Sequence, residues 1–141
     1  MKVKLKRLNE NVLFQAKNEN GNTILIDGSP AIGGVEAGFR PMELLLAGIG
    51  GCSVLDIISI LKKQRQEIRT VEIEVDGERE QGKEVSVFRK INLHFILSGK
   101  IDEQKAERAV NLGVTKYCSV GAMLEKDAEI SYSFEIRNEQ I

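Results

Sequence analysis

The sequence predicts an α+β fold built around one long helix, and three observations support this prediction. Short segments near the N-terminus alternate apolar and polar residues and are separated by turn-forming residues, as expected of strands. Residues 41–64 are apolar on nearly every helical face, and after Arg65 the pattern changes to a period of two. With 141 residues, of which 42% are hydrophobic, the chain is long enough to bury one core. We therefore expect a single domain over residues 1–141.

The first 40 residues predict a meander of three strands followed by a loop. Strands are expected at residues 3–6, 12–16 and 24–26, with asparagine-containing turns between them. Residues 27–40 contain four glycines and Pro30, a composition typical of a loop. The strands need a sheet partner elsewhere.

The long helix is expected to begin at Pro41, because the first turn of a helix tolerates a residue without an N–H. Apolar residues on many faces indicate a helix surrounded by protein: Leu44, Leu45, Leu46, Ile49, Val54, Leu55, Ile57, Ile58, Ile60 and Leu61. Glu43 and Asp56 interrupt the stretch, so we interpret it as a core helix and not as a membrane span. Each glycine in a helix costs on the order of 1 kcal/mol. The glycines at 48, 50 and 51 therefore suggest close approach by a ligand, by another backbone or by the packed sheet.

The second half of the chain predicts a hairpin, a second helix and a final strand. Alternation over residues 71–76 and 85–97 indicates two strands joined at residues 77–82, with His94 on the wet face and without an assigned role. Asp102 is a candidate N-cap for a helix that ends at Cys118. Ser119 can cap a short further turn, and a last strand is expected at residues 130–136.

Composition excludes several classes of function. Lys and Arg number 20 against 21 Asp and Glu, so the chain lacks the basic excess of nucleic-acid-binding proteins. The N-terminus alternates charged and apolar residues, unlike a signal peptide, and we expect a cytoplasmic protein. A single histidine and two cysteines cannot complete a zinc site without further ligands, so no metal and no cofactor are expected.

The two cysteines are the candidate reactive groups, although a buried thiol often serves only as a small apolar side chain. Cys52 follows a run of small residues that leaves room beside its sulfur, and Cys118 lies near a helix junction where free N–H groups can stabilise a thiolate. In a reducing compartment, such a pair favours transient or catalytic thiol chemistry. A cysteine hydrolase would need His94 as a base, and its position in a strand does not favour this. A cation must offset Asp56, one turn after Cys52, and Arg40 and Lys116 are the candidates.

Two motifs resemble the OsmC/Ohr family, named for osmotically inducible protein C and the organic hydroperoxide resistance protein. They are PMELLLAGIGGCS at residues 41–53 and YCSV at residues 117–120. The likeness covers nearly the whole chain, and residues 52–65 look like the YhfA-type branch. The resemblance implies an OsmC-like fold, in which a long buried central helix is wrapped by antiparallel sheets in an intertwined homodimer with two interfacial active sites.

The resemblance also implies a reaction. A peroxidatic thiolate, matching Cys52, reduces an organic hydroperoxide and becomes a sulfenic acid, and Cys118 then condenses with it to a disulfide. A dithiol reductant, lipoyl-linked in the Ohr branch, restores both thiols. In the peroxidase branches, a glutamate directly after the proline holds an arginine over the thiolate. Here Met42 takes that place, Glu43 follows it, and Arg40 is the nearest cation in sequence.

We therefore expect a cytoplasmic thiol-dependent peroxidase with Cys52, Cys118, Arg40 and Glu43 in its site, without nucleic-acid or membrane partners. Two alternatives share the fold. One is a non-catalytic protein that binds a hydrophobic ligand in the dimer cleft, and the other is a general thiol-redox or persulfide-handling protein. Peroxide-dependent consumption of a dithiol distinguishes the first alternative from the peroxidase.

Overall fold

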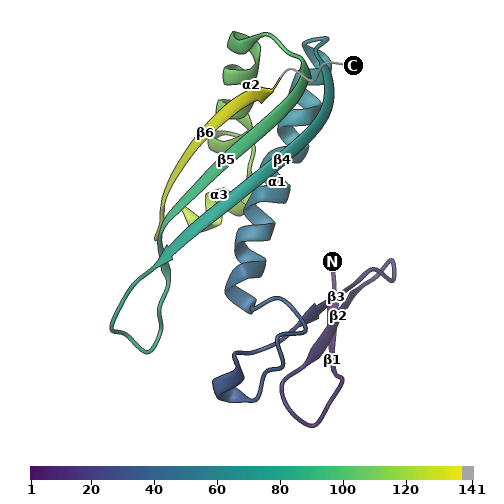
Figure 1. Cartoon of the computed structure of the whole chain (residues 1–141), viewed down its shortest axis with the longest axis vertical. Helices are drawn as coiled ribbons and strands as arrows, with labels where there is room; N and C mark the ends of the chain where they lie inside the picture. The colour runs from purple at the N-terminus through teal and green to yellow at the C-terminus, as the bar shows by residue number, and fades with distance from the viewer. Residues whose placement is uncertain (138–141) are drawn as a thin grey trace. The chain divides into compact units, whose positions relative to one another are not determined.

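The computed structural model describes residues 1–137, which form two compact units, one of residues 1–45 and one that begins at Leu46 (Figure 1). Each unit contains a three-stranded sheet, so the α+β class is confirmed. The elements in chain order are β1 (Val3–Arg7), β2 (Phe14–Asn18), β3 (Thr23–Ile26), the 3₁₀ turn η1 (Pro30–Ile32), α1 (Pro41–Lys63), β4 (Glu67–Arg79), β5 (Phe88–Lys100), α2 (Glu103–Thr115), α3 (Ser119–Leu124) and β6 (Glu129–Arg137). The expectation of one OsmC-like domain stays a prediction.

The N-terminal sheet is the predicted meander, with the antiparallel order β1-β2-β3. Asparagine side chains form its turns. The Asn9 side-chain oxygen accepts from the N–H groups of Asn11 and Leu13, at 2.9 and 3.2 Å. Such a side chain replaces a backbone acceptor in the turn, which is why asparagine is favoured there.

The loop after β3 is organised by Asp27, which sequence reasoning missed. Its side chain is 2% exposed and accepts from the N–H groups of Gly28, Val35 and Ala37 at 2.8, 2.9 and 3.2 Å. The Val35 hydrogen bond is the main reason that the pKa of Asp27 is lowered. A buried carboxylate therefore satisfies the backbone of a loop that has little regular structure of its own.

The second sheet has the order β4-β5-β6 and is mixed. Strands β4 and β5 are antiparallel, but β5 and β6 run parallel, so the expectation of purely antiparallel sheets was wrong here. The reason is that α2 and α3 form a crossover between these two strands, as parallel neighbours require. The hairpin connection also lies later than predicted, at residues 80–87, because β4 continues through Gly77. A Cβ at Gly77 would lie 2.6 Å from the Phe88 ring, so glycine permits close approach within the hairpin.

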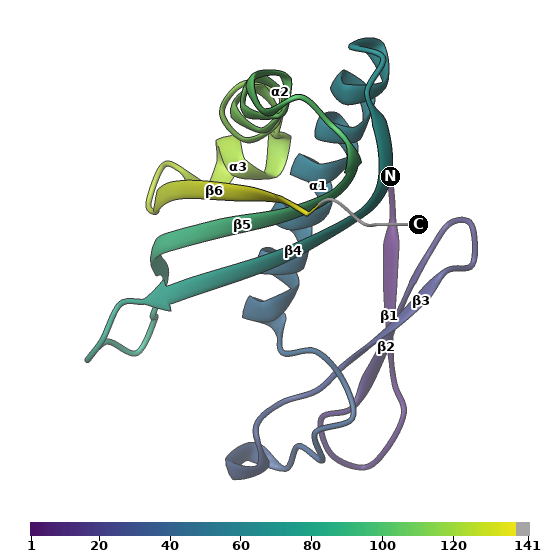
Figure 2. The ribbon, with the colours of Figure 1, turned by 45° about the horizontal axis from the view of Figure 1, so that its top comes forward.

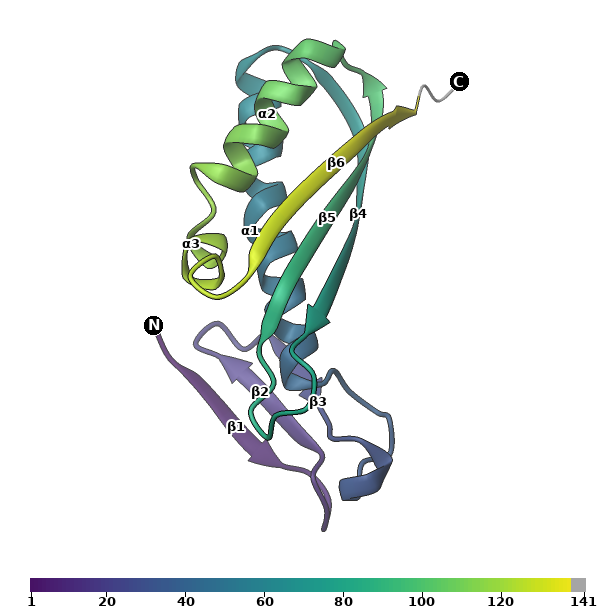
Figure 3. The ribbon, with the colours of Figure 1, turned by 90° about the vertical axis from the view of Figure 1, so that its left-hand side faces the viewer.

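One face of this sheet is buried and the other is polar, as the alternation predicted. Figures 2 and 3 show the helices of this unit on a single side of the sheet. The buried face includes four fully buried residues of β5: Ile91, Leu93, Phe95 and Leu97. On the opposite face, His94 Nδ1 lies 2.7 Å from Ser133 Oγ on the parallel neighbour β6.

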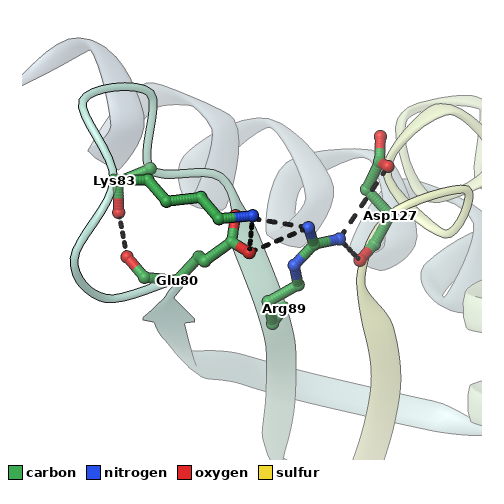
Figure 4. A network of polar contacts seen from close by, with 5 residues as sticks. Glu80, Lys83, Arg89 and Asp127 are labelled. Carbon is green, nitrogen blue, oxygen red and sulfur yellow. Dashed lines mark hydrogen bonds and ion pairs between the residues drawn. The ribbon is translucent and has the colours of Figure 1, made fainter.

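An ion-pair network connects the β4–β5 connection to the turn before β6 (Figure 4). Glu80 contacts Lys83 at 2.9 Å and Arg89 at 3.2 Å, and the Arg89 guanidinium also donates to the Asp127 carbonyl at 3.3 Å. The two cations hold the pKa of Glu80 below its usual value. These groups stabilise the hairpin end of the sheet.

Helix α1 buries one stripe, formed by Ile49, Gly50, Ser53, Ile57 and Leu61. The four-residue spacing of most of these positions gives one continuous helical face. The rest of the helix is less covered, and Leu55 is 71% exposed. α1 is long and apolar enough to cross a membrane, with a mean hydropathy of 2.2 over its most apolar window and 28% of that window buried. The sequence led us to expect a helix surrounded by protein, but the single chain covers α1 only in part.

The glycines of α1 have different surroundings. A Cβ at Gly50 would lie 3.0 Å from the Val75 side chain, whereas one at Gly51 would meet nothing within 4 Å. Close packing against β4 explains Gly50, and within the described chain nothing requires a glycine at position 51.

Candidate active site

The candidate site lies where α1 meets the segment between α2 and α3. Cys52 is half-buried near the middle of α1, and Cys118 is 5% exposed just before α3. Both are free thiols. The structure thus places the two cysteines predicted from the sequence in one unit, on elements that cover the same face of the sheet (Figure 3).

Cys118 is the more constrained sulfur. Its Sγ accepts from the Gly121 N–H at 3.2 Å and serves as the N-cap of α3. It also lies 3.5 Å from Ser53 Oγ and 3.8 Å from the Ile49 carbonyl oxygen, both on α1. A Cβ at Gly121 would be 3.3 Å from this sulfur, so the small residue leaves space for it. The surroundings of Cys118 therefore consist of three polar groups in an otherwise buried position.

Burial raises the pKa of the Cys118 thiol, because desolvation disfavours the thiolate. Hydrogen bonds from Ser53 and Gly121 act in the opposite direction. Cys52 adds to the increase in the pKa through a hydrogen bond and through its charge. Burial thus favours the protonated form of Cys118.

Arg40 and Glu43 lie in the N-terminal unit, where the structure gives them a local role. The Arg40 N–H donates to the Glu43 carboxylate at 2.8 Å. Glu43 is the third residue of α1, and its side chain reaches back to the residue before the helix. This contact is one of the two hydrogen bonds of a capping box. Helix capping explains why glutamate occurs here, and the expectation that Arg40 acts on Cys52 stays a prediction.

The other candidates from the sequence have partners of their own. Lys116 Nζ lies 5.3 Å from the centre of the Tyr117 ring, a cation–π geometry. His94 contacts Ser133 on the polar face of the sheet, in agreement with the view that it is not a base for either cysteine. No group of three residues that could ligate a metal occurs within residues 1–137.

Ser53 is the site residue that sequence reasoning missed. It is fully buried, and its Oγ donates to the Ile49 carbonyl oxygen at 2.8 Å. Serine in a helix often bonds the carbonyl four residues earlier, so the residue type alone does not indicate a function. The available signal was its place on the buried stripe, between Ile49 and Ile57.

Comparison with known proteins finds a matching family and a similar bacterial protein. A model of the OsmC-like protein family matches residues 33–133. Protein YhfA of Escherichia coli K12 is 38% identical over 128 residues, which cover 90% of this chain and 92% of that protein.

Several solved structures are also similar to this chain. A hypothetical protein from Aquifex aeolicus VF5 is similar with a TM-score of 0.84 and 36% identity, covering 99% of this chain and 97% of that one. The organic hydroperoxide resistance protein OhrB of Bacillus subtilis has a TM-score of 0.63 at 21% identity, covering 95% and 96%, and this likeness concerns the fold alone. Taken with the family match and the identity to YhfA, these findings show that the chain belongs to the OsmC-like protein family.

Proposed function

We propose that this chain is a thiol-dependent peroxidase that reduces organic hydroperoxides with Cys52 as the peroxidatic and Cys118 as the resolving cysteine. The observation that supports this assignment best is the contrast between the two sulfurs. Cys52 is half-buried, whereas Cys118 is buried, held by Ser53 and Gly121, and has a raised pKa. The attacking thiol must be accessible to the peroxide, whereas the resolving thiol needs only to reach the attacking cysteine.

The first step transfers one oxygen atom. The Cys52 thiolate attacks the peroxide oxygen, the O–O bond breaks, and the alkoxide leaves and takes up a proton to become an alcohol. Cys52 is oxidised to a sulfenic acid and the hydroperoxide is reduced.

The second step closes the disulfide. Cys118 loses its proton and attacks the Cys52 sulfur, so that an S–S bond forms as the S–O bond breaks, and the hydroxide leaves as water. An external dithiol then reduces the disulfide by exchange. We propose that this takes place in the cytoplasm, where both cysteines are kept as thiols between turnovers.

A trapping experiment tests the assignment. A Cys118→Ser variant treated with one equivalent of cumene hydroperoxide should accumulate a sulfenic acid on Cys52, detectable by dimedone labelling and mass spectrometry. The matched control is Cys52→Ser, in which Cys118 should remain unlabelled. Label on Cys118 in that control would reverse the two roles.

Turnover distinguishes the peroxidase from a binding protein. The parent chain should consume a dithiol such as dihydrolipoamide only when a hydroperoxide is present, and both cysteine variants should fail to do so. Bound hydrophobic ligand without any dithiol consumption would favour the non-catalytic alternative.

A further inference from the structure

Ser53 has one hydroxyl proton and two acceptors within reach. Its Oγ lies 2.8 Å from the Ile49 carbonyl oxygen and 3.5 Å from Cys118 Sγ. A hydroxyl rotates freely about its C–O bond and donates one hydrogen bond at a time. The Ile49 carbonyl oxygen is a stronger acceptor than a neutral thiol sulfur, which favours donation to Ile49 while Cys118 is a thiol.

The same carbonyl also serves the cysteine. Cys118 Sγ lies 3.8 Å from the Ile49 oxygen, so the S–H group and the Ser53 O–H group share this acceptor. Loss of the Cys118 proton changes which acceptor the Ser53 hydroxyl prefers. The thiolate is a charged acceptor in a buried place, and hydrogen bonds to charged groups are stronger than those to neutral ones.

We propose that Ser53 is a positioning residue of the resolving step, whose hydroxyl turns from the Ile49 carbonyl to the Cys118 thiolate as Cys118 attacks Cys52. The thiolate then accepts from two donors, Ser53 Oγ and the Gly121 N–H, in place of one. This proposal rests on the assignment of Cys118 as the resolving cysteine. Ser53 does not exchange electrons or atoms with the substrate.

Electrostatics agree with this geometry. Desolvation raises the pKa of Cys118, and the Ser53 hydrogen bond is the first of the two contacts that oppose it. Without the Ser53 hydroxyl, the buried thiolate would keep only the Gly121 donor. A smaller thiolate fraction at neutral pH slows disulfide closure, because the thiolate is the attacking species.

The direct test measures Cys118 alone. In a Cys52→Ser background, Cys118 is the only thiol, and its ionisation can be followed by the ultraviolet absorbance of the thiolate. Ser53→Ala should raise the titration midpoint by about one pH unit or more, as expected for one hydrogen bond to a charged group. Ser59→Ala, which removes an exposed hydroxyl of the same helix, should leave the midpoint unchanged. This measurement does not depend on peroxidase activity.

A kinetic test then separates the two steps in the parent background. After one equivalent of cumene hydroperoxide, Ser53→Ala should oxidise Cys52 at nearly the parent rate and close the disulfide about tenfold more slowly near pH 7. Raising the pH should restore the closure rate. Ser53→Thr and Ser53→Val form a second pair of nearly equal shape that differs in the hydroxyl, and only the threonine variant should behave like the parent.

The outcomes are distinct. Equal midpoints and equal closure rates for the threonine and valine variants would overturn the role of Ser53. A shifted midpoint without any sulfenic acid on Cys52 in Cys118→Ser would retain the hydrogen bond from Ser53 and reject the peroxidase. If Ser53→Ala does not fold, the threonine and valine pair decides the question.

Discussion

The Gly121 backbone N–H donates to Cys118 Sγ at 3.2 Å, so the sulfur that closes the proposed disulfide is also the cap of α3. We expect a sulfur bonded to Cys52 to move away from Gly121, and this would couple disulfide formation to the capping of α3.

Oxidation should weaken the start of α3. Loss of an N-cap contact costs about 1 kcal/mol, so the Gly121 amide should exchange with solvent roughly fivefold faster in the disulfide form than in the reduced form. Hydrogen exchange measured by NMR checks this, with the buried Val110 amide of α2 as an unaffected reference. Cys118→Ser should keep the protection under oxidant, because serine is itself a good cap. Equal exchange of Gly121 in both redox forms would show that the cap survives disulfide formation.

We expect the protein to be a homodimer in which the uncovered side of α1 is buried. Leu55 is 71% exposed in the single chain, and apolar area contributes about 25 cal/mol per Å² when buried. Leu55→Glu should convert the dimer to monomer, since an unpaired carboxylate would have to be desolvated. Val85→Glu, in the exposed connection between β4 and β5, is the control and should stay dimeric. Light scattering of the parent at micromolar concentration is the measurement, and a stable folded monomer would contradict the expectation.

From the sequence, we expect Arg40 to favour the thiolate of Cys52. A cation near a thiol stabilises its charged form, so Arg40→Ala is expected to move the pH profile of Cys52 alkylation to higher pH. The measurement uses iodoacetamide in a Cys118→Ser background. Lys116→Ala is the matched comparison, because its ammonium lies over the Tyr117 ring. Identical midpoints for the parent and Arg40→Ala would show that Arg40 acts only through the start of α1.

Asp27 should make the N-terminal unit sensitive to acid. Because the Val35 hydrogen bond lowers its pKa from 3.8, the ionised carboxyl stabilises the folded loop above that value, and the contribution is lost as the pH falls through the lowered pKa. Asp27→Asn should therefore reduce exchange protection of the Val35 and Ala37 amides at neutral pH, and the difference from the parent should shrink in acid. Glu36→Gln, an exposed carboxylate in the same loop, should have little effect. A difference that is constant across the pH range would contradict the charged role.

Two helical glycines should respond in opposite directions to alanine. A Cβ at Gly113 of α2 would lie 2.5 Å from the Ile57 side chain and 3.1 Å from the Ser53 carbonyl oxygen, so overpacking should cost about 1–3 kcal/mol. At Gly51 there is open space, and alanine should gain up to about 1 kcal/mol from helix propensity. Urea unfolding measures both. A destabilised Gly51→Ala would indicate that another surface covers this position in the assembled protein.

The sequence by itself determined the kind and order of the elements and the two cysteines of the candidate site. Period-two alternation indicates that one side of a strand is buried, and Pro41 marks the start of α1, because these signals depend on neighbours in the chain. It could not show that β5 and β6 run parallel, since strand partners are decided by how the α2–α3 crossover packs on the sheet.

The tertiary structure alone decided what surrounds the cysteines. Ser53 and Cys118 are 65 positions apart, and their contact exists because α1 and the α2–α3 junction pack together in the second unit. A buried serine on α1 looks the same in the sequence whether it faces an aliphatic side chain or a thiol. Only the packed fold removes water from this place, and removal of water is what makes a single hydroxyl important to the charge on Cys118.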